Sequence, residues 1–410
     1  DLIFAIAVLH TFCTSYFEAL AKKSPRHAGL WHLLGEVEIV FGFWAAILII
    51  FMWLANDLAT AKEYANKRNF TEPLFVFAIM VVAGSKPILH FATQLLHKLG
   101  KLIQLLLRTK QAPTLYFLTL SITPLLGSLI TEPAAMTLAA FLLRDLVYRH
   151  KCSTPLLFGT LGVLFVNISI GGTLTNFAAP PVLMVASTWG WSSAFMFANF
   201  GLEAMIAIFI NATIVTLLFH KQLIEPISKA DQTRIPLTIT VIHLLFLLGI
   251  VAFAHDPVIF MWLLLFFIGY TTAYPKHQNP LILREALLVG FFLAGLVVLG
   301  GLQGWWLQPI LENMSPTAVF YGSLALTAIT DNAALTYLGS LVQGTSPEFK
   351  LALVGGAVAG GGLTVIANAP NPAGLAILRS YFPNAAVSAG LLLIAAIPPT
   401  IVAILALRLL

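Results

Sequence analysis

Long apolar segments separated by short polar connections dominate this chain. Ten such segments lie at 1–20, 30–55, 71–93, 155–188, 192–219, 236–254, 257–274, 281–300, 349–381 and 384–408. Runs of about 18 or more apolar residues with few charges predict helices that cross a membrane. The pattern therefore predicts an all-α polytopic membrane protein with about ten spans.

Two further regions do not fit as simple spans. Residues 114–148 and 316–343 each hold two apolar arms that meet at a polar tip, at Thr131–Pro133 and at Thr330–Asn332. Arms of about 16 residues or fewer are too short to cross a hydrocarbon layer of about 30 Å comfortably. We expect two re-entrant helical hairpins whose tips are buried in protein near the middle of the membrane.

The two hairpin regions belong to an internal repeat. The tips read T-E-P-A-A-M-T from Thr131 and T-D-N-A-A-L-T from Thr330. Each hairpin is followed by an apolar segment containing glycine, asparagine and proline, "GGTLTNFAAPPVLM" at 171–184 and "GGLTVIANAPNPAGLAIL" at 361–378. Glycine and proline inside a span interrupt the helical hydrogen bonds, and such breaks survive only against protein or a wet cavity.

The order of segments predicts four regions. These are N-terminal scaffold spans at 1–70, a first repeat at 71–219, a linker with two spans at 220–280 and a second repeat at 281–410. The first repeat contains hairpin 114–148 and broken helix 155–188, and the second contains hairpin 316–343 and broken helix 349–381. Amphipathic stretches at 97–110 and 303–312 precede the hairpins. An odd number of crossings separates the repeats, so the second is inverted, as in secondary transporters.

Composition agrees with a membrane protein. The chain of 410 residues is 59% hydrophobic and 10% charged. A soluble protein of this length needs far more charge to cover its surface. The net charge of +5 is small and lies in the connections, so it indicates orientation and not a nucleic-acid partner. The two cysteines, Cys13 and Cys152, form neither a disulfide framework nor a metal-site spacing.

The positive charges predict the orientation. If the hairpins do not cross, one side receives the lysine- and arginine-rich segments 21–29, 94–113, 144–154, 220–235 and 274–284. The other side receives 56–70 and connections that carry very few positive charges. Basic connections stay in the cytoplasm, so we expect both termini outside.

The acidic tip residues are the strongest candidates for function. A charge at membrane depth costs at least about 2.5–3.5 kcal/mol on insertion scales, so it is kept for a reason. Glu132 and Asp331 occupy equivalent places in the aligned motifs, and threonines flank each of them, Thr131 and Thr137 in one case and Thr330 and Thr336 in the other. The alternative is that both acids are helix caps, with Pro133 at a favoured first-turn position.

Oxygen ligands at these places suit sodium. Hydroxyl, carbonyl and amide oxygens are hard ligands, and Asn176 and Asn368 add amide oxygens at the two breaks. The candidate sodium ligands are Asp331, Asn176, Asn368 and Glu132. A buried carboxylate that can hold a proton or a sodium ion, but not both well, is sufficient to exchange the two. Glu36 and Glu38 are weaker candidates, for which an interfacial or ion-paired position is as reasonable.

The tip and break motifs resemble a known family. "LITEPAAMTLAA", "GGTLTNFAAPP", "ITDNAALTYLG" and "IANAPNPAG", with "HLLGEVEIVFGFWA" at 32–45, are similar to the bacterial family described as putative sodium/proton antiporters, in the ion transporter superfamily. That superfamily also holds arsenite-efflux and sodium-coupled di- and tricarboxylate transporters. The resemblance implies a homodimer in the bacterial inner membrane, with a fixed scaffold and a mobile elevator domain. It carries site roles to Thr131, Glu132, Thr330, Asp331 and Asn332 at the tips, and to Thr175, Asn176, Asn368 and Asn371 at the breaks.

These observations favour a sodium/proton antiporter that needs no cofactor beyond the sodium it moves. The alternative is a sodium-coupled symporter of a small organic anion, in which the acids bind sodium and the asparagines bind substrate. In the carboxylate-transporting branch the tip sequences resemble Ser-Asn-Thr. This chain has acids at its tips instead, and acidic tips repel an anionic substrate. An intramembrane enzyme is disfavoured because the chain contains neither His-Glu-x-x-His nor Gly-x-Ser-x-Gly. A channel is disfavoured because duplicated broken helices indicate alternating access.

Overall fold

The computed structural model describes the chain except residues 24, 151, 224–234, 384–385 and 410. The predicted connection 220–235 and part of the linker 220–280 therefore lie largely outside the described residues. Within the described residues the fold is all-helical, without strands.

The N-terminal region contains more helix ends than the apolar pattern indicates. Its helices are α1 (Leu2–Thr11), α2 (Thr14–Lys23), η1 (Pro25–His27), α3 (Ala28–Gly35), α4 (Val37–Ala55) and α5 (Leu58–Asn66). The expected span 30–55 is interrupted at Glu36, whose backbone is extended. The expected span 1–20 is interrupted between Thr11 and Thr14.

The next helices differ from the expected layout in one respect. They are α6 (Thr71–Ala83) and α7 (Lys86–Leu107), which are bent by 64° at the break between them. The stretch 97–110 was expected to be a separate amphipathic segment, but it is mostly part of α7. The helix continues until Arg108, whose left-handed backbone with φ of 52° ends it.

The first hairpin region and first broken helix follow. The elements are α8 (Gln111–Ile130), α9 (Glu132–Leu143), η2 (Arg144–Tyr148), α10 (Thr154–Gly171), η3 (Gly172–Leu174) and α11 (Pro180–Trp189). The predicted interruption is present, because no helix covers residues 175–179. The first arm is longer than expected. The helix α8 begins at Gln111 and continues through Pro124, and its 20 residues are long and apolar enough to cross a membrane.

The helices that lead to the second half are mainly long and apolar. They are α12 (Ser193–Met196), η4 (Phe197–Gly201), α13 (Leu202–Phe219), α14 (Leu237–Ala252), α15 (Pro257–Ala273), η5 (Pro275–His277) and α16 (Leu283–Gly300).

The second hairpin region and broken helix complete the chain. The elements are α17 (Gly304–Leu311), α18 (Pro316–Thr327), α19 (Asn332–Ser340), α20 (Pro347–Gly360), α21 (Pro370–Leu378), η6 (Arg379–Tyr381) and α22 (Ala389–Leu409). The arms α18 and α19 are short, as expected. The second interruption is also present, between Gly360 and Pro370.

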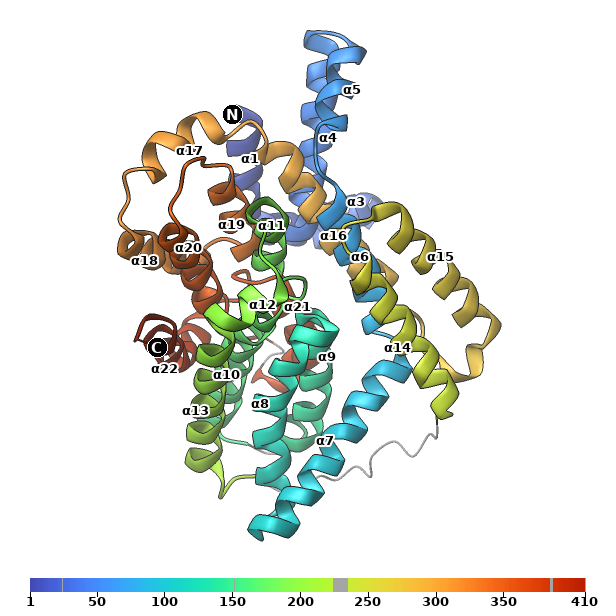
Figure 1. Ribbon diagram of the computed structural model, residues 1–410, viewed down its shortest axis with the longest axis vertical. Coiled ribbons are helices and arrows are strands. Elements are labelled where there is room, and N and C mark those ends of the chain that lie inside the picture. The colour runs from blue at the N-terminus through green and yellow to red at the C-terminus, as the bar shows by residue number, and fades with distance from the viewer. Residues whose placement is uncertain (24, 151, 224–234, 384–385, 410) are drawn as a thin grey trace.

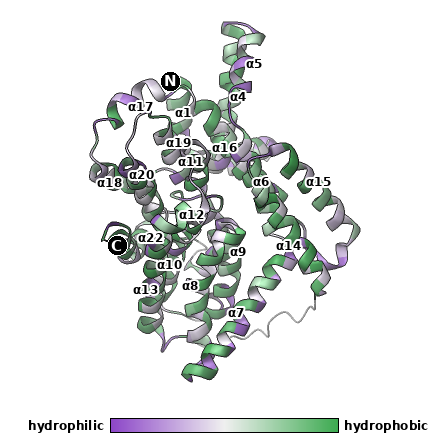
Figure 2. Ribbon diagram, in the orientation of Figure 1, coloured by the Kyte–Doolittle hydropathy of each residue, from purple (hydrophilic) through white to green (hydrophobic). Residues whose placement is uncertain are grey.

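Length and apolarity identify six helices in the described residues that could cross a membrane, and the bent pair α6–α7 would make a seventh. Large apolar side chains are exposed on α13, α14 and α15, including Leu217, Leu245 and Leu265. Figure 2 shows hydrophobic residues distributed along most of the helices. A water-soluble protein does not expose apolar surface on this scale, so the chain is a multi-pass membrane protein.

The helices form two packed groups, which Figure 1 shows on its right and left sides. In one group, α16 packs against α4 and α6, and α14 and α15 pack against α6. In the other, α10 packs against α8, α13 and α22, α8 packs against α9, and α18 packs against α20. The helices on either side of both interruptions belong to this second group, because α11 packs against α19, and α21 packs against α9.

Candidate functional site

The first tip contains an unusual backbone conformation. Thr131 joins α8 to α9 with φ of 73°, and it is one of two non-glycine residues with positive φ among the described residues. A β-branched residue in this conformation costs on the order of 1–3 kcal/mol, and such strain is concentrated at functional sites. The turn places Glu132 as the first residue of α9, with its side chain directed into the protein.

Glu132 is the central acid of the site. Its side chain is 0% exposed. Its Oε2 accepts a hydrogen bond of 2.8 Å from Nδ2 of Asn368, and its backbone N–H donates to the carbonyl of Ala178 over 3.4 Å. Its Oε1 has no hydrogen-bond partner among the described residues. Both asparagine and alanine come from the broken segments, so Glu132 joins the two breaks.

The second tip uses its acid differently. The Oδ1 of Asp331 accepts hydrogen bonds from the backbone N–H groups of Ala333 at 2.8 Å and Ala334 at 3.2 Å. These are the bonds of a helix N-cap, so the capping alternative is correct for Asp331. Its side chain is only partly buried. Its carboxyl group still interacts electrostatically, as a like charge, with that of Glu132. Capping therefore does not remove Asp331 from the site.

Asn332 occupies the buried position at this tip. Its backbone N–H donates to the carbonyl of Ala367 over 3.1 Å, and its side chain is 0% exposed. Neither Oδ1 nor Nδ2 of Asn332 has a hydrogen-bond partner among the described residues. The side chain packs against Gly361, where a Cβ atom would crowd its Nδ2.

Three pairs of contacts match between the two tips. Glu132 and Asn332 donate their N–H groups to Ala178 and Ala367, respectively. Thr175 donates to the carbonyl of Ser128 at 2.7 Å, as Thr364 does to that of Ala328 at 2.8 Å. Gly172 packs against the Glu132 side chain, as Gly361 packs against that of Asn332. These pairs keep one register, 200 positions apart at the tips and 189 at the breaks.

This register corrects the alignment of the sequence motifs. Glu132 corresponds to Asn332 in the structure and not to Asp331, because α9 begins at Glu132 whereas α19 begins one position after Asp331. At the second tip, the carboxylate of Asp331 accepts hydrogen bonds from N–H groups in the first turn of α19. At the first tip, Thr131 stands before α9, and its side chain forms no cap hydrogen bond. The two acids are therefore not interchangeable.

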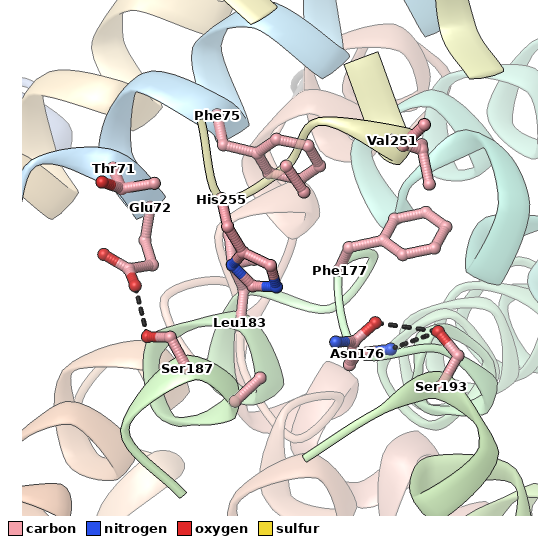
Figure 3. A pocket seen from close by; sticks show the side chains of 13 residues that line it. Thr71, Glu72, Phe75, Asn176, Phe177, Leu183, Ser187, Ser193, Val251 and His255 are labelled. Atoms are coloured by element: carbon pink, nitrogen blue, oxygen red, sulfur yellow. Dashed lines mark hydrogen bonds between the residues drawn. The ribbon is translucent and has the colours of Figure 1, made fainter. Parts of the chain in front are cut away.

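In the same register, Asn176 and Asn368 do not occupy equivalent positions in the two breaks. The Nδ2 of Asn176 donates to the carbonyl of Trp191 at 2.9 Å, and its Oδ1 accepts from Ser193 Oγ at 2.8 Å. Figure 3 shows Asn176 and Ser193 on the wall of a cavity that also contains Glu72. Of the four candidate sodium ligands, Glu132 and Asn368 are in direct contact, Asp331 is an electrostatic neighbour, and Asn176 lines this other cavity.

Several buried oxygens around Glu132 and the breaks are available for a cation. Among the described residues, no hydrogen-bond partner is found for Thr131 Oγ1, Glu132 Oε1, Asn332 Oδ1, Asn368 Oδ1 and Asn371 Oδ1. Thr131, Asn368 and Asn371 are 2%, 0% and 0% exposed, so water does not readily satisfy them. Leaving such atoms unpaired costs free energy, and hydroxyl, amide and carboxylate oxygens are the ligands that hard cations prefer. These oxygen types are ones that Na+ accepts as ligands.

The remaining predicted side chains support the backbone. The hydroxyls of Thr137, Thr330 and Thr336 donate to carbonyls one helical turn earlier, at Pro133, Leu326 and Asn332. The Nδ2 of Asn371 donates to the carbonyls of Gly361 at 2.8 Å and Thr364 at 2.9 Å, which satisfies two of the backbone groups freed by the second break. The hydroxyl of Thr175 donates to the carbonyl of Ser128 and so ties the first break to α8.

The structure adds contacts that the motifs did not predict, one of them made by a residue that no motif singled out, Ser128. Ser128 accepts from the N–H of Leu174 and donates to the carbonyl of Gly171, and it therefore fixes the start of the first break. Glu36 forms an ion pair with Arg284, so the paired alternative is correct for it. Glu38 interacts electrostatically with Asp331, which places the start of α4 near the second tip. Only tertiary contacts reveal these relations, because each residue lies outside the repeated motifs.

Comparison with known proteins gives one family. A family model described as "Putative Na+/H+ antiporter" matches residues 1–410. No curated protein matches the chain. The family description agrees with the oxygen-rich, acidic site built from the two tips and breaks.

Proposed function

Since the chain belongs to this putative Na+/H+ antiporter family, we propose that it exchanges Na+ for H+ as a secondary active transporter and that Glu132 binds the two ions in turn. The family supports a multi-pass cation/proton transporter rather than an enzyme, with Na+ and H+ as the transported ions. The assignment of ion binding to individual residues is our own.

One observation carries the proposal. Glu132 is completely buried, one of its oxygens is held by Asn368, and the other has no partner among the described residues. A buried carboxylate without a positive partner is costly, so a proton or a cation must neutralise it. Because only one of them fits at a time, binding of Na+ releases H+, and binding of H+ releases Na+. This competition is the chemistry of an antiporter.

Other residues divide the remaining work. The oxygens of Asn368, Asn332 and Thr131 complete the sodium shell when the proton leaves Glu132, with the supporting Thr175 and Asn371 fixing the two breaks. Asp331 caps α19 and adds a second negative charge that attracts cations to the site. The ion replaces the hydrogen-bond partners that these buried oxygens lack in the described residues.

We further propose that the transporter works by elevator-type alternating access. The matched contacts at the two tips support a pair of inverted repeats with re-entrant hairpins, since each tip meets its own break in the same way. The group containing α4, α6 and α16 would be the fixed scaffold, and the group containing both tips and both breaks would move. Many transporters of this architecture bind at the repeat interface and alternate by moving one body against the other.

The proposed setting is a homodimer in the bacterial inner membrane, with both termini outside. Positive charge in the predicted cytoplasmic connections supports this orientation. Figure 1 shows the α7–α8 connection and the end of α13 at the bottom of the molecule, and α5 and α17 at the top. These two basic connections thus lie at the end of the molecule opposite α5 and α17.

Reconstituted vesicles test the function. We expect an imposed Na+ gradient to move protons in the opposite direction without any organic substrate, and Glu132→Gln to abolish this movement. Glutamine keeps the size of the side chain and the acceptor for Asn368 but removes the exchangeable charge. Exposed Glu63→Gln is the control, because Glu63 pairs with Lys67 on the surface with side-chain exposures near 67% and 65%. Sodium flux that appears only with an added carboxylate would instead establish anion symport.

A further inference from the structure

A second acidic cavity lies apart from the Glu132 site. Its volume is about 270 Å³, and it is bounded by α6, α11, α12, the first break and the connection from α14 to α15. Figure 3 shows Glu72 on one side of the cavity, Asn176 and Ser193 on the other side, and His255 between them. The polar groups thus converge from separate parts of the chain on one cavity.

Glu72 is the charged group of this cavity. Glu72 is 8% exposed, and its Oε1 accepts hydrogen bonds from Asn69 Nδ2 at 3.1 Å and Ser187 Oγ at 2.5 Å. No lysine or arginine among the described residues forms an ion pair with it. Glutamates this buried are almost always paired. A largely buried carboxylate without a protein counter-ion is costly, and a cation from solution would offset that cost.

The cavity adjoins the Glu132 site through the first break. Asn176 and Phe177 form part of the cavity wall, and the next residue, Ala178, accepts the backbone hydrogen bond of Glu132. Phe177 also meets Phe75 of α6 edge to face, with ring centroids 6.4 Å apart. An ion in the cavity would thus be separated from the deep site by the backbone and side chains of 176–178. His255 is exposed, which leaves one wall of the cavity open toward solution.

We propose that this cavity is a second binding site for a hydrated monovalent cation, with Glu72 as its anionic ligand and the polar groups of Ser187, Asn176 and Ser193 around the ion's water shell. The site is large enough to hold an ion with part of its water. Its role as an access site for Na+ on the side predicted to face outside rests on the proposed antiport function, whereas binding itself does not. Because the Glu72–Ser187 hydrogen bond connects the two helix groups, occupancy of the site also bears on their contact.

Sodium binding is measured without transport. The thermal unfolding midpoint of the purified full chain in detergent is followed as NaCl replaces choline chloride at constant ionic strength, since a ligand of the native state raises it. In Glu132→Gln, which removes the deep charge, we expect a Na+-dependent rise to persist. In the double variant with Glu72→Gln, we expect this rise to disappear. Glutamine retains the acceptor for Asn69 and Ser187, so this change preserves the hydrogen bonds.

A milder variant and a transport measurement complete the test. Glu72→Asp keeps the charge but withdraws it by one methylene. The Na+-dependent rise of the unfolding midpoint should therefore be reduced less by this variant than by Glu72→Gln. In vesicles, Glu72→Gln should raise the apparent KM for Na+ about tenfold when Na+ is on the cavity side, which corresponds to about 1.4 kcal/mol. Glu63→Gln should leave it unchanged.

Either of two results overturns the second site. One is the absence of any Na+-dependent rise of the unfolding midpoint in Glu132→Gln, which would mean that Na+ binds at the Glu132 site and not in the cavity. The other is a Na+ response in the double variant equal to that of Glu132→Gln. If the wild type binds Na+ in this pattern but moves no protons, the proposed function fails while the cavity site stands.

Discussion

Asn368 donates a hydrogen bond of 2.8 Å from its Nδ2 to Oε2 of Glu132, across 236 positions of sequence. The bond joins the second break to the first tip, so the second half of the chain completes the polar surroundings of Glu132. It also leaves one oxygen of each residue, Glu132 Oε1 and Asn368 Oδ1, without a partner among the described residues. The pair therefore offers two oxygens to an ion where the first tip meets the second break.

Removing this amide should weaken sodium binding. Asn368→Ala deletes both the donor to Glu132 and a candidate ligand oxygen, and hydrogen bonds to charged groups contribute about 1.5–3 kcal/mol. We expect the apparent KM for Na+ in vesicles to rise by about tenfold or more. Asn313→Ala is the control, since Asn313 is exposed and donates only to the carbonyl of Pro309. An unchanged KM in Asn368→Ala would remove Asn368 from the site.

The two roles of Asp331 can be separated by substitution. Asn caps helices about as well as Asp, whereas loss of an N-cap to Ala costs about 0.5–2 kcal/mol. Asp331→Asn should therefore unfold at nearly the wild-type temperature, and Asp331→Ala should unfold several degrees lower. Thermal unfolding in detergent measures both.

Transport by the same variants tests the charge of Asp331. Both substitutions remove the negative charge beside Glu132, so both should weaken the apparent affinity for Na+ by several-fold. The loss should be smaller than the complete loss expected for Glu132→Gln, because Glu132 alone is fully buried. If Asp331→Asn transports like the wild type, Asp331 is a cap and nothing more.

Gly172 should tolerate no side chain. A Cβ atom there would collide with the carboxylate of Glu132, and at Gly361 it would collide with Ser169 and crowd Asn332. Overpacking of this kind costs about 1–3 kcal/mol. We expect Gly172→Ala to lower the transport rate by tenfold or more, and Gly361→Ala to have a similar effect. Gly269→Ala in α15, where nothing lies within 4 Å of the added atom, is the control. Wild-type rates in Gly172→Ala would show that the position of Glu132 is not critical.

Linking the two helix groups should stop an elevator motion. Glu72 of α6 and Ser187 of α11 are in hydrogen-bond contact, so cysteines at both positions should react with a short bifunctional thiol reagent. The background needs Cys13→Ala and Cys152→Ala, since Cys13 is exposed and Cys152 is partly exposed. At saturating Na+, we expect the reagent to arrest transport by the double-cysteine variant and to spare either single-cysteine variant. Full activity after complete cross-linking would exclude relative movement of α6 and α11.

The sequence by itself determined the class of the protein and the location of its irregular backbone. A hydrocarbon environment requires every backbone group to be satisfied internally, so long apolar runs specify helices, and glycine and proline inside them specify breaks. Both interruptions and the helix ends at Thr131 and Asp331 were predictable for this reason. The length of α8 was not, because the helix begins before position 114 and continues through Pro124, and the apolar pattern encodes neither feature.

Only the tertiary structure decided which polar residues meet. The motifs align Glu132 with Asp331 and give both breaks an asparagine, but a helix that begins one residue later turns its side chains by about 100°. That single shift gives Asn332 the contacts that correspond to those of Glu132 and makes Asp331 a cap. Contacts of the breaks decide that Asn368, and not Asn176, meets the buried acid. Apolar positions on every face of these helices carry little information about register, so contacts between distant segments had to supply it.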